Sequence, residues 1–542
     1  MCDNNNSNNH IRKGAALEHG DAHEREHAFW SRRQFLNATG LFALGSAFAL
    51  GGNRIQAFAK SPALTKALMD ANNERVLVII FLGGGNDGLN MIIPRDNTTY
   101  YDIRPTIAVQ EANLEALSPE FGLNSAMADL MPLWNDGKMA VVHSVAYPSQ
   151  DYSHFRSTDI WASGSAASVY LNSGWLGRYL EYEYPAYDIA PNEAPIAIQV
   201  GVQSSLVLMG NDTSMALTVN NPTEFYQIAQ TGQIYPNDSL PDCAYGEELG
   251  FMRQMANNTV RYAESVKYAY DRATPATYPA DNDLAEQLAI TARLIKGGLS
   301  TRIYLLEIHG FDTHANQLDN HPYLLQQIGS AVKAFYDDLG AAGIDENVLT
   351  MTFSEFGRTN AENGSLGTDH GQAAPLMMFG GTTIGGLKGT FSPLVDGDSY
   401  DQSYTTDYRS VYSAILTDWF CLDPLVVRGI MNDQFAPTPN LIAPCPPSVG
   451  SNDLAILLGH DRSLSQSNTL LIKYAILQRG LVRLQLLNSA GQVKATLVNT
   501  TQEPNSYTVQ VVPAAHGLPP GEYLYRLDTG GKTYSRRVMI AY

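Results

Sequence analysis

Two acid–histidine pairs are the residues whose types and spacing most plainly indicate chemistry in this sequence. Asp312 and His314 are two residues apart in a glycine-containing loop, and Asp369 and His370 are adjacent in a second loop flanked by glycines. Carboxylate oxygen and imidazole nitrogen together suit zinc, manganese or iron. Each pair therefore predicts part of a divalent metal site. The alternative for Asp312 and His314 is a pair of side chains hydrogen-bonded within their own loop.

Two further carboxylates follow predicted strands. Asp87 comes just after a strand that ends in Gly83-Gly84-Gly85, and Glu355 directly follows a strand at 348–353. The glycine-rich turn lacks the G-x-G-x-x-G spacing of a dinucleotide site, so a metal-ligating aspartate fits Asp87 better. A helix-capping aspartate is the alternative.

Together these positions predict a site for one or two divalent cations, with zinc or manganese the most plausible. Two cations would clamp an in-line displacement at phosphorus or sulfur. The six expected ligands are Asp87, Asp312, His314, Glu355, Asp369 and His370.

Ser153-His154 is a third candidate, because it follows a strand and stands at the expected start of a helix. The free N–H groups of a helix N-terminus stabilise an anion, so either side chain is a candidate nucleophile or phosphate ligand. Serine is also a common N-cap, which is the alternative for Ser153. Arg156 or Arg358 is expected to clamp the substrate anion.

The elements that must position these residues read as alternating strands and helices. Uninterrupted apolar strands are typical of a parallel sheet covered on both faces, whose ligands lie at the carboxyl ends of the strands. The sequence therefore predicts an α/β domain over residues 60–435 with a doubly wound, mostly parallel sheet. The strands are expected at 76–81, 139–142, 196–200, 303–308 and 348–353, and helices at 283–295 and 323–339.

The chain changes character after this domain. A proline-rich stretch, 436–467, is expected to be a linker. Residues 468–542 show short alternating strands and turn sequences, which predict a small all-β sandwich. The segment Leu518-Pro519-Pro520-Gly521-Glu522-Tyr523 and the final basic strand resemble the C-terminal sorting domain of type IX secretion cargo. The alternative is a carbohydrate-binding or spacer sandwich.

The N-terminal region has the layout of a twin-arginine export signal. Arg32-Arg33 precede a short apolar run at 41–50, and Ala57-Phe58-Ala59 offers a cleavage site after Ala59. We expect a polar leader at 1–27 and a signal peptide at 28–59; a chance Arg-Arg pair before a buried helix is the alternative. No other apolar stretch approaches the roughly 20 residues of a transmembrane helix.

These signals predict an exported protein that passes through the periplasm to the cell surface or the medium. Its expected partners are the twin-arginine translocase and the type IX secretion machinery. A disulfide between Cys421 and Cys445 suits such a compartment and would leave Cys243 as a thiol. The net charge of −19 argues against nucleic acid or anionic lipid as a partner.

On these motifs, residues 76 to about 422 resemble the domain of unknown function 1501 family, which is itself similar to the alkaline phosphatase and sulfatase superfamily. The resemblance implies that Asp87 is the metal ligand of the first strand and that Asp312 and His314 match a metal-binding pair. Glu355 and His370 fall where later ligands lie. The segments that carry the resemblance are 84–88, 153–155, 309–314, 354–358, 368–371 and 407–412.

The sequence also departs from the superfamily. The superfamily usually has an Asp-His pair after its late strand, and this sequence has Glu355-Phe356 there. At the position of the nucleophile it has His154. It contains no C-x-P-S-R or S-x-P-S-R motif, which formylglycine chemistry requires. Two functions remain open. One is a metal-dependent hydrolase of phosphate or sulfate esters, acting on a small molecule or a polysaccharide. The other is a surface-displayed binding or assembly protein on an inactive hydrolase fold.

Overall fold

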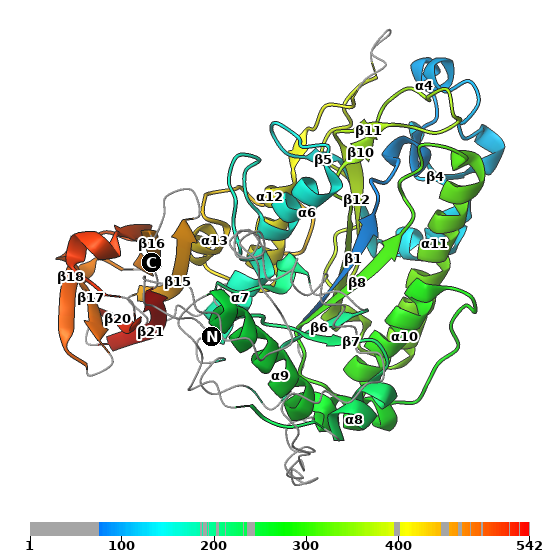
Figure 1. The fold of residues 1–542 in the computed structure, drawn as a ribbon. Helices are drawn as coiled ribbons and strands as arrows, with labels where there is room; N and C mark the ends of the chain where they lie inside the picture. Colours follow the sequence, from blue (N-terminus) through cyan, green and yellow to red (C-terminus); the bar gives the residue numbers. More distant parts are fainter. Residues whose placement is uncertain are drawn as a thin grey trace, which may run out of the picture.

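The protein is described by a computed structural model that covers residues 75–540 apart from short internal stretches (Figure 1). The expected leader and signal peptide, residues 1–59, and Cys243 lie outside the described residues. The internal stretches outside the description are 185–186, 188–191, 193, 202–204, 212, 231, 236–243, 395–400, 446–454, 464–468, 477, 489–490, 520 and 530–531.

A nine-stranded sheet forms the centre of the larger domain, with the strand order β13-β5-β12-β9-β1-β8-β6-β7 and β14 paired to β5. Every pairing is parallel except those of β12, which runs antiparallel to β5 and β9. The predicted mostly parallel α/β sheet is therefore confirmed. The strands are β1 (Val76–Gly83), β5 (Met139–Ala146), β6 (Ala197–Val200), β7 (Leu217–Val219), β8 (Ile303–His309), β9 (Val348–Phe353), β12 (Ala374–Gly380), β13 (Gly386–Lys388) and β14 (Thr406–Asp407).

Helices cover both faces of this sheet (Figure 1). One side carries α10 (Asp283–Lys296) and α11 (Gln317–Ala341), and the other carries α6 (His154–Ser163) and α12 (Tyr408–Ala414). The central strands are mostly apolar, and Val76 to Ile80 of β1 are fully buried. Because helices bury both faces of the sheet, a shift in the pairing of β1, β8 or β9 would move their side chains out of their packed positions. The register of these strands is therefore fixed, and so are the positions of their ends.

The C-terminal domain consists of two antiparallel sheets that share one apolar core. It packs against α7 (Trp175–Glu183) and α13 (Pro424–Met431), with Arg428 bonded to Asn505 at 2.7 Å. One sheet holds β15 (Ala455–Ser463), β16 (Thr469–Ile476) and β19 (Asn505–Val511), and the other holds β17 (Gly480–Asn488), β18 (Val493–Gln502), β20 (Gly521–Thr529) and β21 (Lys532–Ile540).

The segment expected to be a linker, 436–467, is structured in most of its described part. Leu441 is fully buried against the larger domain, and β15 begins at Ala455, inside the expected linker. The apolar run Ala455–Leu458 pairs with β16, so it belongs to the sandwich despite the prolines before it. The β-domain therefore starts about a dozen residues earlier than the sequence suggested.

Cys421 and Cys445 form the expected disulfide, with their Cα atoms 5.6 Å apart. The guanidinium of Arg75, at the start of the described chain, lies 3.1 Å from both sulfur atoms. The bridge thus ties the end of the larger domain to the entry of its central strand. In the part of the chain that the structure describes, no helix combines the length and apolar composition needed to cross a bilayer.

The disulfide gives the first testable prediction. Because it closes a loop of 24 residues, its loss should widen the unfolded ensemble and lower the free energy of unfolding by about 3.5 kcal/mol. Denaturant titration of the Cys421→Ser/Cys445→Ser protein against the oxidised wild type measures this. The reduced wild type is the control and should match the variant; equal stability of all three forms would contradict the prediction.

Candidate functional site

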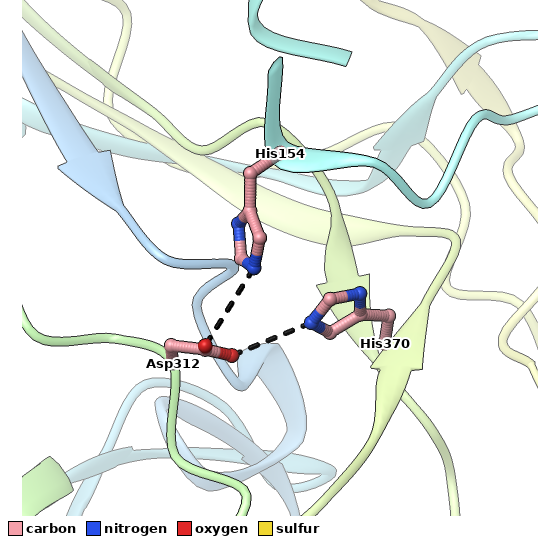
Figure 2. Close-up of side chains that lie close together, drawn as sticks. All are labelled: His154, Asp312 and His370. Atoms are coloured by element: carbon pink, nitrogen blue, oxygen red, sulfur yellow. Dashed lines mark hydrogen bonds and ion pairs between the residues drawn. The ribbon is translucent and has the colours of Figure 1, made fainter. Parts of the chain in front are cut away.

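Three side chains from distant parts of the chain meet at the carboxyl edge of the central sheet (Figure 2). His154 is the first residue of α6, Asp312 lies in the loop after β8, and His370 lies in the short strand β11 (His370–Gly371). One Asp312 carboxylate oxygen is 3.6 Å from Nε2 of His154, and the other is 3.3 Å from Nε2 of His370. One ligand atom of each residue lies within 4.8 Å of the other two, which is a spacing that one cation can bridge.

His314 lies beside Asp312 and His370 of this group. Its Nε2 lies 3.1 Å from the Asp312 carboxylate and 3.0 Å from Nε2 of His370. We call His154, Asp312, His314 and His370 the His3Asp cluster. The sequence predicted three of them as ligands and His154 as a catalytic residue, and the structure brings all four together.

The outer nitrogen of each histidine is held by a fixed partner. Nδ1 of His154 lies 2.8 Å from the Glu355 carboxylate, and Nδ1 of His314 lies 2.8 Å from the Asp369 carboxylate. Nδ1 of His370 lies 2.9 Å from the backbone carbonyl of Tyr152. All three rings therefore turn Nε2 inward, which is how metal-binding histidines are oriented by their outer partners.

The inward nitrogens of His314 and His370 lie close together. The Tyr152 carbonyl can only accept, so Nδ1 of His370 carries the hydrogen, and Nδ1 of His314 faces the Asp369 carboxylate, whose pKa is lowered chiefly by this hydrogen bond. The two Nε2 atoms are 3.0 Å apart, a contact that needs a proton or a cation between them. Burial lowers the pKa of His370.

Glu355 contacts His154 from outside the cluster. Its side chain is almost fully buried, and one carboxylate oxygen accepts from the Gly84 N–H at 2.9 Å as well as from His154. The hydrogen bond to Glu355 is the main reason that the pKa of His154 is raised. The end of β9 places this carboxylate behind the histidine ring, on the side away from Asp312. Asp369 has the same relation to His314.

Asp87 does not join the His3Asp cluster. Its buried carboxylate pairs with both terminal nitrogens of Arg104, at 2.7 and 3.0 Å, and also accepts from Gln317. It caps the short helix that follows by accepting from the Leu89 N–H at 3.2 Å, which is the alternative noted from sequence. Burial acts to raise the pKa of Asp87, but the attraction and hydrogen bonds of Arg104 outweigh it. With its oxygens used in this way, we leave Asp87 out of the metal site.

Both arginines expected to clamp an anion are bound to the protein itself. Arg156 donates to the carbonyls of Ala167 and Val169 at 2.7 Å each, and its guanidinium stacks 3.7 Å from the centre of the Tyr170 ring. Arg358 has no exposed side-chain surface. Its guanidinium bonds the Asp312 carboxylate at 2.6 Å and the carbonyls of Gly84, Gly85, Phe311 and Thr368.

Ser153 stands directly before α6 as its N-cap residue, yet its side chain makes no capping bond. Its backbone N–H is instead fixed by the Asp151 carboxylate at 2.8 Å, and the residue is exposed. Ser153 is thus an exposed residue next to His154, without a capping role for its side chain.

Sequence reasoning missed Arg104 and Tyr152. Arg104 is 17 residues from Asp87, a separation with no motif, and Tyr152 acts through its backbone carbonyl, which any residue could supply. The glycines after the first strand were a better sequence signal, because they indicated that the backbone is approached closely there. Gly84 has φ of +125°, and a Cβ there would clash with the backbone nitrogen of Asp312, so only glycine lets the two loops touch.

The middle of the chain is similar to a family without assigned chemistry. A family model described as a protein of unknown function (DUF1501) matches residues 140–407, a range that contains the whole His3Asp cluster. No curated protein matches the chain significantly.

Similar solved structures include a sulfatase and two proteins named for alkaline phosphatase. The PsFucS1 sulfatase from Pseudoalteromonas sp. is 10% identical over 84% of this chain and 91% of its own, with a TM-score of 0.31. An alkaline phosphatase superfamily protein from Vibrio parahaemolyticus is 8% identical over 83% and 84%, with a TM-score of 0.26. Alkaline phosphatase from the Antarctic bacterium TAB5 is 10% identical over 58% and 94%, with a TM-score of 0.24. Similarity this weak says nothing about a reaction, which depends on the side chains of the site.

The buried position of Arg358 leads to a prediction about stability. Arg358→Gln leaves several buried carbonyls and the Asp312 carboxylate without their donor, so the free energy of unfolding should fall by about 3–5 kcal/mol. Arg483→Gln, on an exposed position of β17, is the matched control and should change it by less than about 0.5 kcal/mol. Equal urea midpoints for the two variants would show that Arg358 does not hold the site together.

Proposed function

We propose that this protein is a hydrolase of phosphate or sulfate esters that uses one divalent cation held by the His3Asp cluster. The observation that carries the proposal is the convergence of three Nε2 atoms on the Asp312 carboxylate, each ring fixed from outside by Glu355, Asp369 or the Tyr152 carbonyl. Each of these Nε2 atoms lies within 3.6 Å of an Asp312 carboxylate oxygen, so one cation could take the place of the contacts between them.

The donor set fits zinc best. Three imidazole nitrogens and one carboxylate oxygen are ligand types that zinc takes, whereas manganese prefers more oxygen. With four protein ligands, zinc would have to expand to five-coordinate to admit water or an ester oxygen. When bound, such a cation polarises an ester oxygen and lowers the pKa of water.

The chain itself supplies the other parts of an ester-binding site. The helix α6 begins at His154, and because the Ser153 side chain does not cap it, its N-terminal N–H groups are available to an anionic group beside the cluster. His154 is excluded as an attacking group, since Glu355 holds one nitrogen and the cluster uses the other. Ser153 remains the candidate nucleophile among the side chains.

The alternative is a binding or assembly protein with a structural metal. It is favoured by the arginines, because Arg156 and Arg358 are both bonded to backbone carbonyls and neither is free to clamp a substrate. Structural zinc sites are closed by four protein ligands, and His314 would be the fourth here.

Metal content and turnover separate the two functions. We expect about one zinc per chain in the wild type, loss of zinc in Asp312→Ala and His370→Ala, and a roughly 10–100-fold weaker affinity in Glu355→Gln because it orients His154 from outside. His516→Ala, an exposed histidine of the C-terminal domain, is the control. Zinc-loaded wild type should hydrolyse aryl phosphates or sulfates. Zinc bound without turnover would favour the structural alternative, and a metal-free wild type would exclude both.

We also propose that the chain is exported and then sorted by its C-terminal domain. The support is the Arg32-Arg33 segment with its apolar run, the Cys421–Cys445 disulfide, and the resemblance of residues 518–542 to a sorting domain. Twin-arginine transport moves folded proteins, which suits a site assembled from residues between 154 and 370.

Export is tested in cells by two changes. Arg32→Lys/Arg33→Lys should keep the protein in the cytoplasm, and removal of 455–542, the whole β-domain, should leave it in the periplasm. Cell fractionation and surface protease digestion measure both. Unchanged surface delivery of the shortened chain would refute the sorting role, and unchanged export of the lysine variant would refute the signal.

A further inference from the structure

Glu307 and His309 form a third acid–histidine pair, which lies outside the His3Asp cluster. Both lie near the end of β8, two residues apart, so their side chains share one face of the sheet. The Glu307 carboxylate lies 3.3 Å from Nε2 of His309, and the histidine side chain is 66% exposed.

Glu307 is fixed firmly enough to orient its partner. Its other carboxylate oxygen accepts from the Gln199 amide at 3.2 Å. The Gln287 side chain bonds the backbone N–H of Glu307 at 3.1 Å and its carbonyl at 2.9 Å. The neighbouring strand and helix thus hold the end of β8 in place, and the carboxylate stays on one nitrogen of His309.

The other nitrogen of His309 lies over the strand that leads into the site. Gly83 is paired with His309 in the sheet, and a Cβ at Gly83 would clash first with Nδ1 of the ring. The next residue, Gly84, gives its N–H to Glu355 and touches the backbone of Asp312. Gly83, which the His309 ring covers, and Gly84, which faces the Asp312 loop, are consecutive residues, so their Cα atoms are about 3.8 Å apart. The His309 ring therefore lies close to the loop that carries the cluster carboxylate.

We propose that His309, oriented by Glu307, is the general acid that protonates the leaving oxygen, and that the substrate is the phosphate or sulfate ester of an aliphatic alcohol such as a sugar hydroxyl. This rests on the proposed ester hydrolysis. A phenolate leaves without help, whereas an alkoxide is too basic to leave unprotonated, so a dedicated proton donor is useful only for the second class.

The step balances without any further reactant. The bond between phosphorus or sulfur and the ester oxygen breaks, and its electron pair stays on that oxygen. The oxygen takes the proton from Nδ1 of His309, which gives the free alcohol. The Ser153 hydroxyl oxygen forms the new bond to phosphorus or sulfur and gives its proton to solvent, which returns one to His309. Water then cleaves the bond between that atom and the Ser153 oxygen, leaves its own oxygen on phosphorus or sulfur and restores the hydroxyl.

The charged groups that face His309 hold the proton in place for this task. Its hydrogen bond with Glu307 is the main cause of a raised pKa, burial opposes it, and the negative charges of Glu307 and Glu355 add to it. Phe81 on β1, whose ring meets the His309 ring edge-on, and Gln199 on β6, which bonds Glu307, are uncharged. The donor form therefore persists to higher pH than in a free histidine, and loss of Glu307 should move its deprotonation to lower pH.

The test compares two esters that differ only in the leaving group, a nitrophenyl ester and a sugar ester of the same acid, with the zinc-loaded full chain. His309→Gln should lower kcat/KM for the sugar ester about 10²–10⁴-fold and for the nitrophenyl ester less than tenfold, and it should remove the alkaline limb of the pH profile. Glu307→Gln should shift that limb to lower pH. His516→Gln is the matched control and should leave both esters unchanged.

A second readout needs no turnover. The proton NMR titration of His309 should give a pKa above the ordinary value of about 6.5 in the wild type and a lower one in Glu307→Gln. Equal losses for the two esters in His309→Gln, or a titration that ignores Glu307, would overturn the inference while leaving ester hydrolysis intact. A wild type that hydrolyses neither ester would overturn the proposed function and this inference together.

Discussion

The buried guanidinium of Arg358 is the interaction on which the site depends. It bonds Asp312 and four carbonyls from the loops after β1 and β8 and before β11, and none of its surface reaches solvent. A buried charge is tolerated only when its donors are satisfied, so these loops can close around it in one arrangement. That arrangement turns Asp312 toward the histidines. Loops from three strands, otherwise free to vary, are thereby fixed to one another.

A second buried pair, Asp87 with Arg104, limits what the site can hold. The carboxylate that follows the first strand is neutralised by an arginine of the same chain, so it has no charge left to offer a second cation. The His3Asp cluster is therefore proposed to bind one ion. Glu355 and Asp369 set the ring orientation of His154 and His314 from outside the cluster. Glu307 and His309 do not belong to these outer partners. We propose His309 as the proton donor and Glu307 as the residue that orients it.

The sequence predicted the sheet well because β1, β9 and the first part of β8 are buried and mostly apolar on both faces, a pattern with few other solutions. It also located Asp312, His314 and His370, because ligands gather where parallel strands end. It could not assign Asp87 or Glu355. Both carboxylates follow strands, and only the path of residues 97–104 decides which of them meets an arginine. The start of β15 was missed for a similar reason, since the prolines before it indicate a break in structure and not where the next strand begins.

The most direct test of the account is anomalous diffraction at the zinc edge from crystals of the zinc-loaded protein. We expect one peak about 2.0–2.2 Å from Nε2 of His154, His314 and His370 and from the Asp312 carboxylate, with no zinc at Asp87. A peak bound to Asp87, two peaks, or none at the His3Asp cluster would contradict the claim that these four side chains form a single cation site.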